Sequence, residues 1–332
     1  MKTARIKNEV VLDASSRRPG KDYHVKTALW DQIAVSSATS EPVDQAESVD
    51  HETEFRNGKI RFFERKHGFT PNLEQPRKFS EKLLLRILSD PDPFYPLYGT
   101  KLNAPFFLAG RVPHGLKFVP RLKVKHRVTP DDFSDLPSAF VMKSSFGSGV
   151  NEIITDASTV DLHDLCQKMN AKIPQVVNAQ GNSDPANCVI FEAYLGDPEG
   201  NAPDDFKFHC FHRKDRQAEV IIQVDSNRFG DHRQSMFDED LNRLDLVFNN
   251  KERHETPPVM PENIGQMITI ARQLSDGFDY IRVDLYSIGG EIYFGEFTPF
   301  HQGGMGPVSS SEWDHRLGNL WQFRLPAYSG TG

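Results

Sequence analysis

Two stretches of alternating side chains, joined by a pair of glycines within residues 279–306, constrain the fold of this chain more than any other feature. In the first stretch Arg282 and Asp284 alternate with apolar residues, and in the second Glu296 and Thr298 have the same parity. A period of two is typical of a strand with one buried face. The segment therefore predicts an antiparallel hairpin whose polar residues include two carboxylates.

The length of the turn decides whether these two carboxylates meet. A three-residue loop at 288–290, with Gly290 in the left-handed region, would place Asp284 and Glu296 on the same side of the sheet. A two-residue loop would send them to opposite faces. If they meet, the two acids and the Thr298 hydroxyl form a hard-oxygen site suited to Mg²⁺, and Arg282 could neutralise a phosphate beside it. The alternative is a pair of surface carboxylates balanced by Arg282.

A second segment, residues 140–153, contains a lysine followed by a short glycine-containing loop. A strand is expected to deliver Lys143, and Gly147, Ser148 and Gly149 follow before the chain becomes extended again. Glycines allow backbone N–H groups to approach phosphate oxygens closely, and Lys143 adds a positive charge. The pattern indicates either a phosphate-binding loop or a simple hairpin turn, and it lacks the ending of a Walker motif.

Residues 189–196 form an apolar stretch that ends in a connector. The stretch indicates a buried strand with Glu192 near its end. A strand of this kind can present backbone donors and acceptors to the edge of an adenine ring, although the pattern alone predicts only a buried strand.

The polar residues between 204 and 233 fall into two groups. Lys207 and His209 alternate with apolar residues that include Cys210, so they are expected on the face opposite the core. The second group, beyond the next strand, consists of Asp225, Arg228, His232 and Arg233. This group suits a carboxylate or phosphate of a substrate, and the alternative is a solvated loop. The histidines in this segment lack the spacing of metal ligands.

Composition limits the classes of partner. The 332 residues carry a formal net charge of −7, which argues against nonspecific binding to nucleic acid. One basic run, residues 111–127, indicates a solvated strand face or, as the alternative, a surface near an anionic substrate. No apolar run is long enough for stable membrane insertion, and the first residues lack the pattern of a secretory signal. Three well-separated cysteines, Cys166, Cys188 and Cys210, predict reduced thiols in a cytoplasmic protein.

Helices and strands interleave without a regular βαβ rhythm, so the predicted class is α+β. Ser80 is expected to cap a helix, residues 158–161 resemble a capping box, and Pro261 is expected at the first position of a further helix. Strands are expected at 189–195, 206–212, 219–225, 280–286 and 291–298. The predicted organisation is a poorly ordered extension (1–54), a helical lead-in (55–110), a small lobe with the glycine-rich loop (111–190) and a large lobe with the metal and substrate site (191–332).

Several of these segments, taken in order, resemble the TupA-like ATP-grasp family. The matching pieces are FVMKSSFGSG, DFKFHCF, QVDSNRF with FDEDLNRL, and RVDLYSIGGEIYFGEFT followed by EWDHRLG, within residues 79–321. The resemblance implies two α+β lobes whose antiparallel sheets clasp ATP, with Mg²⁺ as the metal. It also implies a ligase that activates a carboxylate as an acyl phosphate and joins it to an amine. The implied substrates are an amino acid or peptide and a carboxylated sugar or small molecule, in polysaccharide biosynthesis.

The resemblance also implies roles for individual residues. The nucleotide would be bound by Lys101, Lys143, Gly147, Ser148, Gly149, Glu192, Ala193, Tyr194 and Leu195. Asp284, Glu296 and Thr298 would hold the metal. Arg282 and Lys207 would steady the transferring phosphoryl group, and Arg228 would steady the acceptor or the acyl phosphate. Gly303 and Gly304 would approach the carboxyl substrate, beside the cluster of Asp225, Arg228 and Arg233. Lys101 lies in a stretch that departs from the family pattern, and Thr298 stands where many ATP-grasp enzymes have Asn.

Two other functions fit the same residues. An ATP-grasp kinase would transfer the phosphoryl group to a hydroxyl, and a non-catalytic protein would bind the nucleotide without turnover. A phosphorylated product would distinguish the kinase from the ligase, and tight ATP binding without turnover would indicate the non-catalytic protein. A homodimer is compatible with the sequence.

Overall fold

The computed structural model describes residues 45–89, 92, 94–147, 149–196, 203–213, 217–226 and 231–323. The chain divides into two units, Met1–Thr53 and Glu54–Gly332. The predicted extension at 1–54 lies outside the described residues up to residue 44, and helix α2 (Gln45–His67) begins at its end. Both sheets belong to the second unit.

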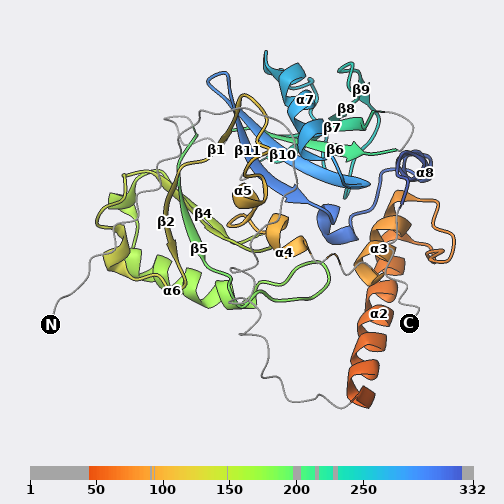
Figure 1. The fold of residues 1–332 in the computed structure, drawn as a ribbon, viewed down its shortest axis with the longest axis horizontal. Coiled ribbons are helices and arrows are strands. Elements are labelled where there is room, and N and C mark those ends of the chain that lie inside the picture. The colour runs from red at the N-terminus through yellow and green to blue at the C-terminus, as the bar shows by residue number, and fades with distance from the viewer. Residues whose placement is uncertain are drawn as a thin grey trace, which may run out of the picture. The chain divides into compact units, whose positions relative to one another are not determined.

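The second unit combines helices with two sheets (Figure 1). Its α-helices are α3 (Phe79–Ser89), α4 (Tyr95–Tyr98), α5 (Ala104–Phe107), α6 (Leu162–Lys172), α7 (Ile264–Leu274) and α8 (Ser311–Leu320). Its strands are β1 (Leu116–Phe118), β2 (Arg121–Lys125), β3 (Phe140–Ser144), β4 (Asn151–Ile154), β5 (Val189–Ala193), β6 (Asp205–Phe211), β7 (Glu219–Ser226), β8 (Arg233–Phe237), β9 (Arg243–Leu244), β10 (Tyr280–Ile288) and β11 (Glu291–Thr298). The five strands expected from the apolar patterns, which became β5, β6, β7, β10 and β11, are confirmed.

The smaller sheet has four antiparallel strands in the order β2-β5-β3-β4. Alternate residues of β3 and β5 point into a core that α6 closes, with Met142, Phe191 and Met169 buried there. The other side chains of these strands, Lys143 and Glu192 among them, face away from that core. The second face is mixed, because Val141 and Ile190 lie on it beside Lys143 and Glu192.

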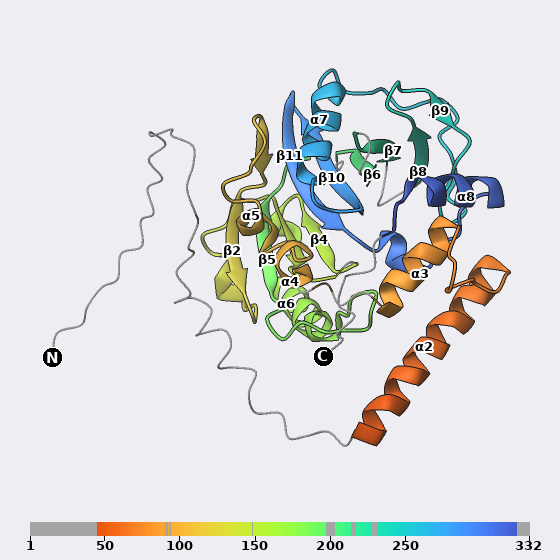
Figure 2. The same ribbon diagram turned by 45° about the vertical axis from the view of Figure 1, so that its right-hand side comes forward.

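The larger sheet has seven strands in the order β1-β11-β10-β6-β7-β8-β9. All neighbours are antiparallel except β1 and β11, which are parallel. Helix α7 covers one face, where Phe208, Val283 and Leu285 are buried with Met267 (Figure 2). Strand β1 lies within residues 111–190, the range predicted for the small lobe, but it pairs into the larger sheet.

Helix α3 begins differently from the expectation that Ser80 caps it. The Glu81 carboxylate accepts hydrogen bonds from backbone N–H groups of Asn72, Arg77 and Lys78, which precede the helix, and the N–H of Ser80 in the first turn donates to Asp314 at 2.9 Å. Ser80 instead lies inside the helix and donates to Asp314 of α8 at 2.6 Å. The expected cap is wrong because a tertiary contact with α8 takes the Ser80 hydroxyl.

Two other helix starts also differ from expectation. Asp161, expected as the acidic end of a capping box, is itself the N-cap of α6 and accepts from the N–H groups of His163 and Asp164. Helix α7 begins at Ile264, and Pro261 lies in the preceding turn with its carbonyl accepting from Ile264. Both elements are present, but each boundary lies a few residues later.

The basic strand β2 is not a solvated face. Leu122 and Val124 are the exposed residues, each at 37%, while the alternating cations are half-buried. Lys123 pairs with Asp135, and Lys125 pairs with Asp132, both at 2.5 Å. These lysines therefore hold the segment that follows β2, and their charges are matched by Asp135 and Asp132.

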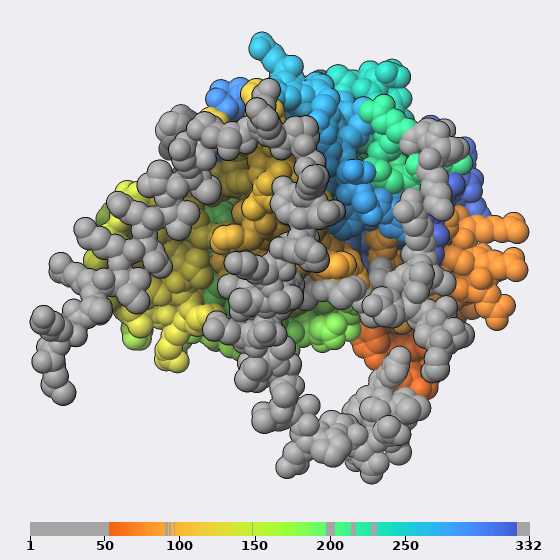
Figure 3. Space-filling view, in the orientation of Figure 1, coloured from red at the N-terminus to blue at the C-terminus, as the bar shows by residue number. Residues whose placement is uncertain are grey.

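The segment that contains α4 and α5 lies between the two sheets, where its atoms, yellow-orange in Figure 3, adjoin those of the larger sheet. The backbone N–H of Lys101 donates to the carbonyl of Ser145 at 2.8 Å. Arg121 of β2 donates to the carbonyl of Lys101 at 3.1 Å. These two contacts fix the position of Lys101 beside the loop after β3.

All three cysteines are buried and free, as expected of reduced thiols, and Cys210 belongs to the core of the larger sheet. Within the described part of the chain, no helix combines the length and apolar character needed to cross a bilayer.

Candidate active site

The hairpin of β10 and β11 closes with a two-residue turn. Ile288 pairs with Glu291, so only Gly289 and Gly290 form the loop. Both glycines have positive φ, 57° and 82°, which a two-residue hairpin turn requires at both positions. Of the two loop lengths that the sequence left open, the structure therefore has the two-residue loop. By the parity of a regular hairpin, Asp284 and Glu296 should then lie on opposite faces.

A β-bulge reverses that consequence. Leu285 pairs with Phe294, but the next pair is Asp284 with Glu296, so Gly295 is an extra residue on β11. The extra residue shifts the parity of the strand by one, which puts the two acids directly opposite each other on one face. A Cβ atom at Gly295 would lie 3.0 Å from the carbonyl oxygen of Asp284, so a larger residue would press on the bulge.

Arg282 lies at the centre of this face. Its Nε and Nη2 atoms donate to the two carboxylate oxygens of Asp284, both at 2.7 Å. Nη2 also faces Thr298 Oγ1 at 2.9 Å and Glu296 Oε1 at 3.4 Å. Nη1 donates to Nδ1 of His301 at 2.9 Å. The guanidinium group thus joins both acids and the hydroxyl that the sequence placed in one site.

The two acids have different electrostatic environments. Burial raises the pKa of Asp284, against the opposing effect of Arg282 and Lys207. Burial also favours a higher pKa for Glu296, but the charges of Lys101 and Arg282 outweigh burial and lower that pKa to about 2. Lys101 Nζ lies 3.3 Å from Glu296 Oε2. Glu296 is therefore held as an anion by cations on both sides.

The residues fit a magnesium ion that shares its coordination with phosphates. Among the described residues, no set of three or more His, Cys, Asp or Glu side chains is arranged to hold a metal by itself. Mg²⁺ commonly takes one or two carboxylates and completes its coordination with substrate phosphates and water. Asp284 and Glu296, opposite each other on one sheet face, supply such a pair of oxygen donors.

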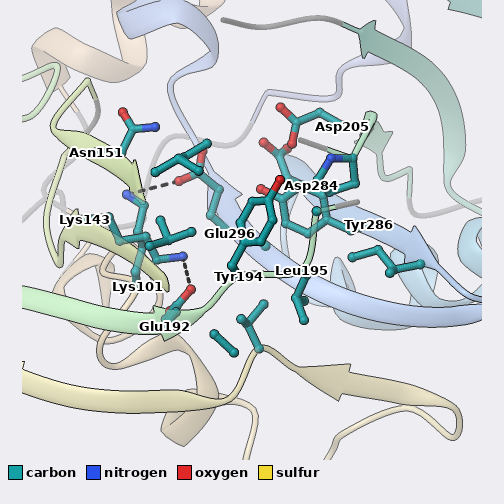
Figure 4. Close-up of a pocket in the computed structure, with 18 of the residues that line it drawn as sticks. Lys101, Lys143, Asn151, Glu192, Tyr194, Leu195, Asp205, Asp284, Tyr286 and Glu296 are labelled. Atoms are coloured by element: carbon teal, nitrogen blue, oxygen red, sulfur yellow. Dashed lines mark ion pairs between the residues drawn. The ribbon is translucent and has the colours of Figure 1, made fainter. Parts of the chain in front are cut away.

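A cavity lies beside these acids and is bounded by both sheets (Figure 4). Its lining includes Lys101, Lys143, Gly147, Gly149, Glu192, Ala193, Tyr194, Leu195, Asp284 and Glu296. Lys143 of β3 and Glu192 of β5 form an ion pair at 2.5 Å on one wall. Lys101 donates to the carbonyl of Gly147 at 2.7 Å, which ties the glycine loop to the same wall. Ser148 lies outside the described residues.

Lys207 lies next to the acids on the neighbouring strand β6, directly opposite Asp284. It forms ion pairs with Asp205 at 2.9 Å and Asp225 at 3.1 Å, and all three side chains are buried. Burial lowers the pKa of Lys207, but Asp205 and Asp225 outweigh it and raise the pKa above the usual lysine value. Lys207 therefore carries a fixed positive charge beside Asp284.

Asp225 anchors this lysine through a buried network. It accepts hydrogen bonds from Gln223 at 2.8 Å and Gln234 at 3.2 Å, and His232 lies 3.3 Å away. Burial raises the pKa of Asp225, but His232 and Lys207 outweigh that effect and hold it well below the usual range. Asp225 is thus an internal counter-ion whose oxygens are already engaged.

Residues 81–322 match the model of the family described as TupA-like ATPgrasp. The chain belongs to this family. The ATP-grasp fold expected from the sequence is therefore confirmed, and the two sheets with a cavity between them are the parts of that fold described above. Comparison with curated proteins found no match.

This ATP-grasp chain is similar to several solved structures, all at low sequence identity. D-alanine–D-alanine ligase from Helicobacter pylori is 12% identical, with 68% of this chain and 60% of that chain covered and a TM-score of 0.39. N5-carboxyaminoimidazole ribonucleotide synthetase from Thermus thermophilus is 11% identical, with 64% and 48% covered and a TM-score of 0.35. The ATP-grasp ligase PsnB, complexed with a phosphomimetic variant of its minimal precursor, Mg and ADP, is 15% identical, with 61% and 50% covered and a TM-score of 0.33. The present chain thus spans between 48% and 60% of the length of these three proteins.

Of the residues proposed from the sequence for the substrate, Arg233, Gly303 and Gly304 are not among those that line the cavity. Arg233 pairs with Asp231 at 2.8 Å and Glu252 at 2.5 Å near the surface. Gly303 and Gly304 form a left-handed turn after β11, where a Cβ at Gly304 would lie 2.2 Å from Ile87. Arg228 lies outside the described residues. The structure thus brings together the described residues that were proposed for the nucleotide and the metal, but not the whole group proposed for the substrate.

Sequence reasoning missed three polar residues of the site. Asp205 and Tyr286 line the cavity of this ATP-grasp chain, and so does Asn151 at the start of β4. Tyr286 shares the parity of Arg282 and Asp284, so the alternation along β10 was a usable signal. Asp205 precedes Lys207 by two residues and has the same parity. Asn151 carried no such signal, because its position depends on the pairing of β3 with β4.

Acid is expected to destabilise this ATP-grasp fold through His209. Burial and then Arg282 lower the pKa of His209 from 6.5 to about 3. The folded protein therefore keeps this imidazole neutral, while the unfolded chain binds a proton below about pH 6.5. The contribution of His209 to the free energy of unfolding is fully present above that pH and falls as the pH decreases towards 3. At pH 5 the loss amounts to about 2 kcal/mol.

Urea unfolding of wild type and His209→Gln at pH 7 and pH 5 measures this effect. The loss of unfolding free energy between the two pH values should be smaller in His209→Gln by about 2 kcal/mol. His163→Gln, at an exposed position of α6, should lose as much as wild type. Equal losses in all three proteins would contradict the assignment of the acid sensitivity to His209.

Proposed function

We propose that this chain is an ATP-dependent ligase that activates a carboxylate as an acyl phosphate and joins it to an amine. The observation that carries the proposal is the meeting of Asp284, Glu296 and Arg282 on one sheet face at the edge of a two-sheet cavity. Membership of the ATP-grasp family supports ATP as the nucleotide. Among the residues proposed for the substrate, Arg233, Gly303 and Gly304 do not line this cavity.

The cavity wall on the smaller sheet is suited to a nucleotide. The backbone of residues 194–195, just after β5, would face the adenine edge, because backbone groups beyond a strand end have no partner in the ladder. Lys143, already paired with Glu192, and Lys101 would face the phosphates. The N–H groups near Gly147 and Gly149, both with positive φ, would approach the phosphate oxygens.

Asp284 and Glu296 would hold Mg²⁺ together with the phosphates, and Thr298 lies beside them. A bound Mg²⁺ supplies Lewis-acid neutralisation of charge on the phosphoryl oxygens. Arg282 and Lys207 contribute fixed positive charge at the same place, and neither has to reorganise because each is already held by buried partners. The chain thus provides pre-organised electrostatics rather than an acid or base of its own.

The reaction has two balanced steps. A carboxylate oxygen attacks the γ-phosphorus, the bond between that phosphorus and the β,γ-bridging oxygen breaks, and ADP leaves with the acyl phosphate formed. The amine nitrogen then attacks the acyl carbon, the carbon–oxygen bond to phosphate breaks, and the departing phosphate takes the proton that the amine loses. Closure of the glycine loop over the site would limit hydrolysis of the acyl phosphate by water.

The substrates we propose are an amino acid or peptide as one partner and a carboxylated sugar or small molecule as the other. The relation to the TupA-like family supports this choice. A cytoplasmic site of action and a role in polysaccharide assembly belong to the same proposal.

A screen of ADP release against panels of carboxylates and amines tests the proposal. We expect ADP release that depends on one carboxylate class, and a hydroxamate when hydroxylamine replaces the amine. Mass spectrometry should then show an amide product when both substrates are present. A phosphorylated alcohol without hydroxamate would indicate the kinase alternative. ATP binding with no turnover on any panel would indicate a non-catalytic nucleotide-binding protein.

A further inference from the structure

His301 contacts Arg282 from the side opposite Asp284. The Nδ1 atom of His301 lies 2.9 Å from Nη1 of Arg282, and both side chains are buried, His301 at 2% exposure. A guanidinium group has only donors and keeps its charge in proteins. His301 must therefore accept this hydrogen bond, which requires an unprotonated Nδ1 and places the ring proton on Nε2.

The surroundings of His301 fix its ring. The ring of Phe248 lies 4.3 Å away between centroids, and the ring of His209 lies 4.7 Å away, both edge-on. Among the described residues, no group accepts a hydrogen bond from Nε2 of His301. Burial, followed by His209 and Arg282, holds the pKa of His301 well below 6.5. The ring is therefore a neutral acceptor clamped between two other rings.

The backbone of His301 is fixed as well. The residues after it, Gln302, Gly303 and Gly304, all have positive φ, between 49° and 72°. This left-handed turn packs against α3 so closely that a Cβ atom at Gly304 would collide with the side chain of Ile87. Arg86 of α3 also donates to the carbonyl of Pro299 at 3.4 Å. Helix α3 thus sets the place from which His301 reaches Arg282.

We infer that His301 is a positioning residue that aims the Arg282 guanidinium at Asp284 and at the phosphoryl group, and that it works as the neutral Nε2–H tautomer. A carboxylate in its place would form a competing ion pair and draw charge away from the cavity. A neutral acceptor orients Arg282 and leaves its charge directed at the site. This inference rests on the proposed function, because it assigns His301 to the same phosphoryl transfer.

Two substitutions of His301 test the inference. His301→Asn places an amide oxygen near the Nδ1 position, so it should keep kcat for carboxylate-dependent ADP formation within about threefold of wild type. His301→Leu has similar bulk but no acceptor, so kcat should fall about 10- to 100-fold, the range for losing a group that orients a site residue. KM for ATP should change little, because Lys101 and Lys143 are untouched. Equal kcat values for His301→Leu and wild type would overturn the inference.

A second measurement separates this inference from the proposed ligase. ¹⁵N NMR of histidine-labelled wild type, with His301→Asn to assign the signal, should show an unprotonated Nδ1 and a protonated Nε2. A protonated Nδ1 would overturn the inference whatever the activity. A wild type without carboxylate-dependent ADP formation would instead count against the ligase, and the tautomer would still be decided by the spectrum.

Discussion

Replacing Asp284 by Asn should lower carboxylate-dependent ADP formation at least about 100- to 1,000-fold, the range for removing one group that faces developing charge. The amide keeps the shape of the carboxylate but loses its charge, so one of the two oxygen anions of the proposed magnesium site disappears. Arg282 should stay in place, because Thr298 and His301 still accept its hydrogen bonds. Steady-state ADP release and thermal unfolding of the same preparation measure the two effects separately.

The matched control is Glu291→Gln at the far end of the same hairpin. Glu291 is half-exposed and pairs with Lys117 at 3.0 Å, away from the acids. Its substitution removes one negative charge from β11 and should leave the rate within about twofold of wild type, because surface ion pairs contribute little. An Asp284→Asn protein with wild-type turnover would remove the assignment of this carboxylate to the metal.

Replacing Asp225 by Ala should destabilise the fold by about 3–5 kcal/mol, the cost of removing one partner of a buried ion pair. Lys207 would lose one of its two ion-pair partners and keep Asp205, and the amides of Gln223 and Gln234 would lose their acceptor. The free energy of unfolding in urea measures the loss. The size of the effect follows from burial, since Asp225 is 4% exposed.

Asp231→Ala provides the comparison for Asp225→Ala. Asp231 is an exposed carboxylate that pairs with half-buried Arg233, and its removal should cost no more than about 0.5 kcal/mol. The pair of variants also separates two roles of Asp225. An Asp225→Ala protein that unfolds like wild type but has a raised KM for one substrate would show a direct substrate contact instead of an internal counter-ion.

The sequence predicted the hairpin of β10 and β11 but not the way in which its acids meet. The glycine pair left open a loop of two or three residues; the turn uses two, and Gly295 forms a bulge. A signal for the bulge was present. The apolar residues Ile292, Phe294 and Phe297 change spacing from two to three at a glycine, which is typical of an extra residue in a strand.

Other features could not be predicted from local pattern. The ion pair of Lys143 with Glu192 depends on β5 entering the sheet between β2 and β3, which is a matter of topology. Ser80 has the sequence context of a helix cap, and only the packing of α8 shows why its hydroxyl binds Asp314. His301 lies in an irregular turn, so no periodicity indicated its contact with Arg282.

The parallel pairing of β1 with β11 affects how the chain can fold. These are the first and last strands along the described sequence, yet they are neighbours in the larger sheet. Contacts between such distant segments form slowly, because a long intervening chain must be ordered first. Strand β11 also carries Glu296, so a ribosome-bound chain that lacks this strand has neither a partner for β1 nor a complete pair of acids. Completion of the acid pair and the pairing of β1 therefore both depend on the same late strand.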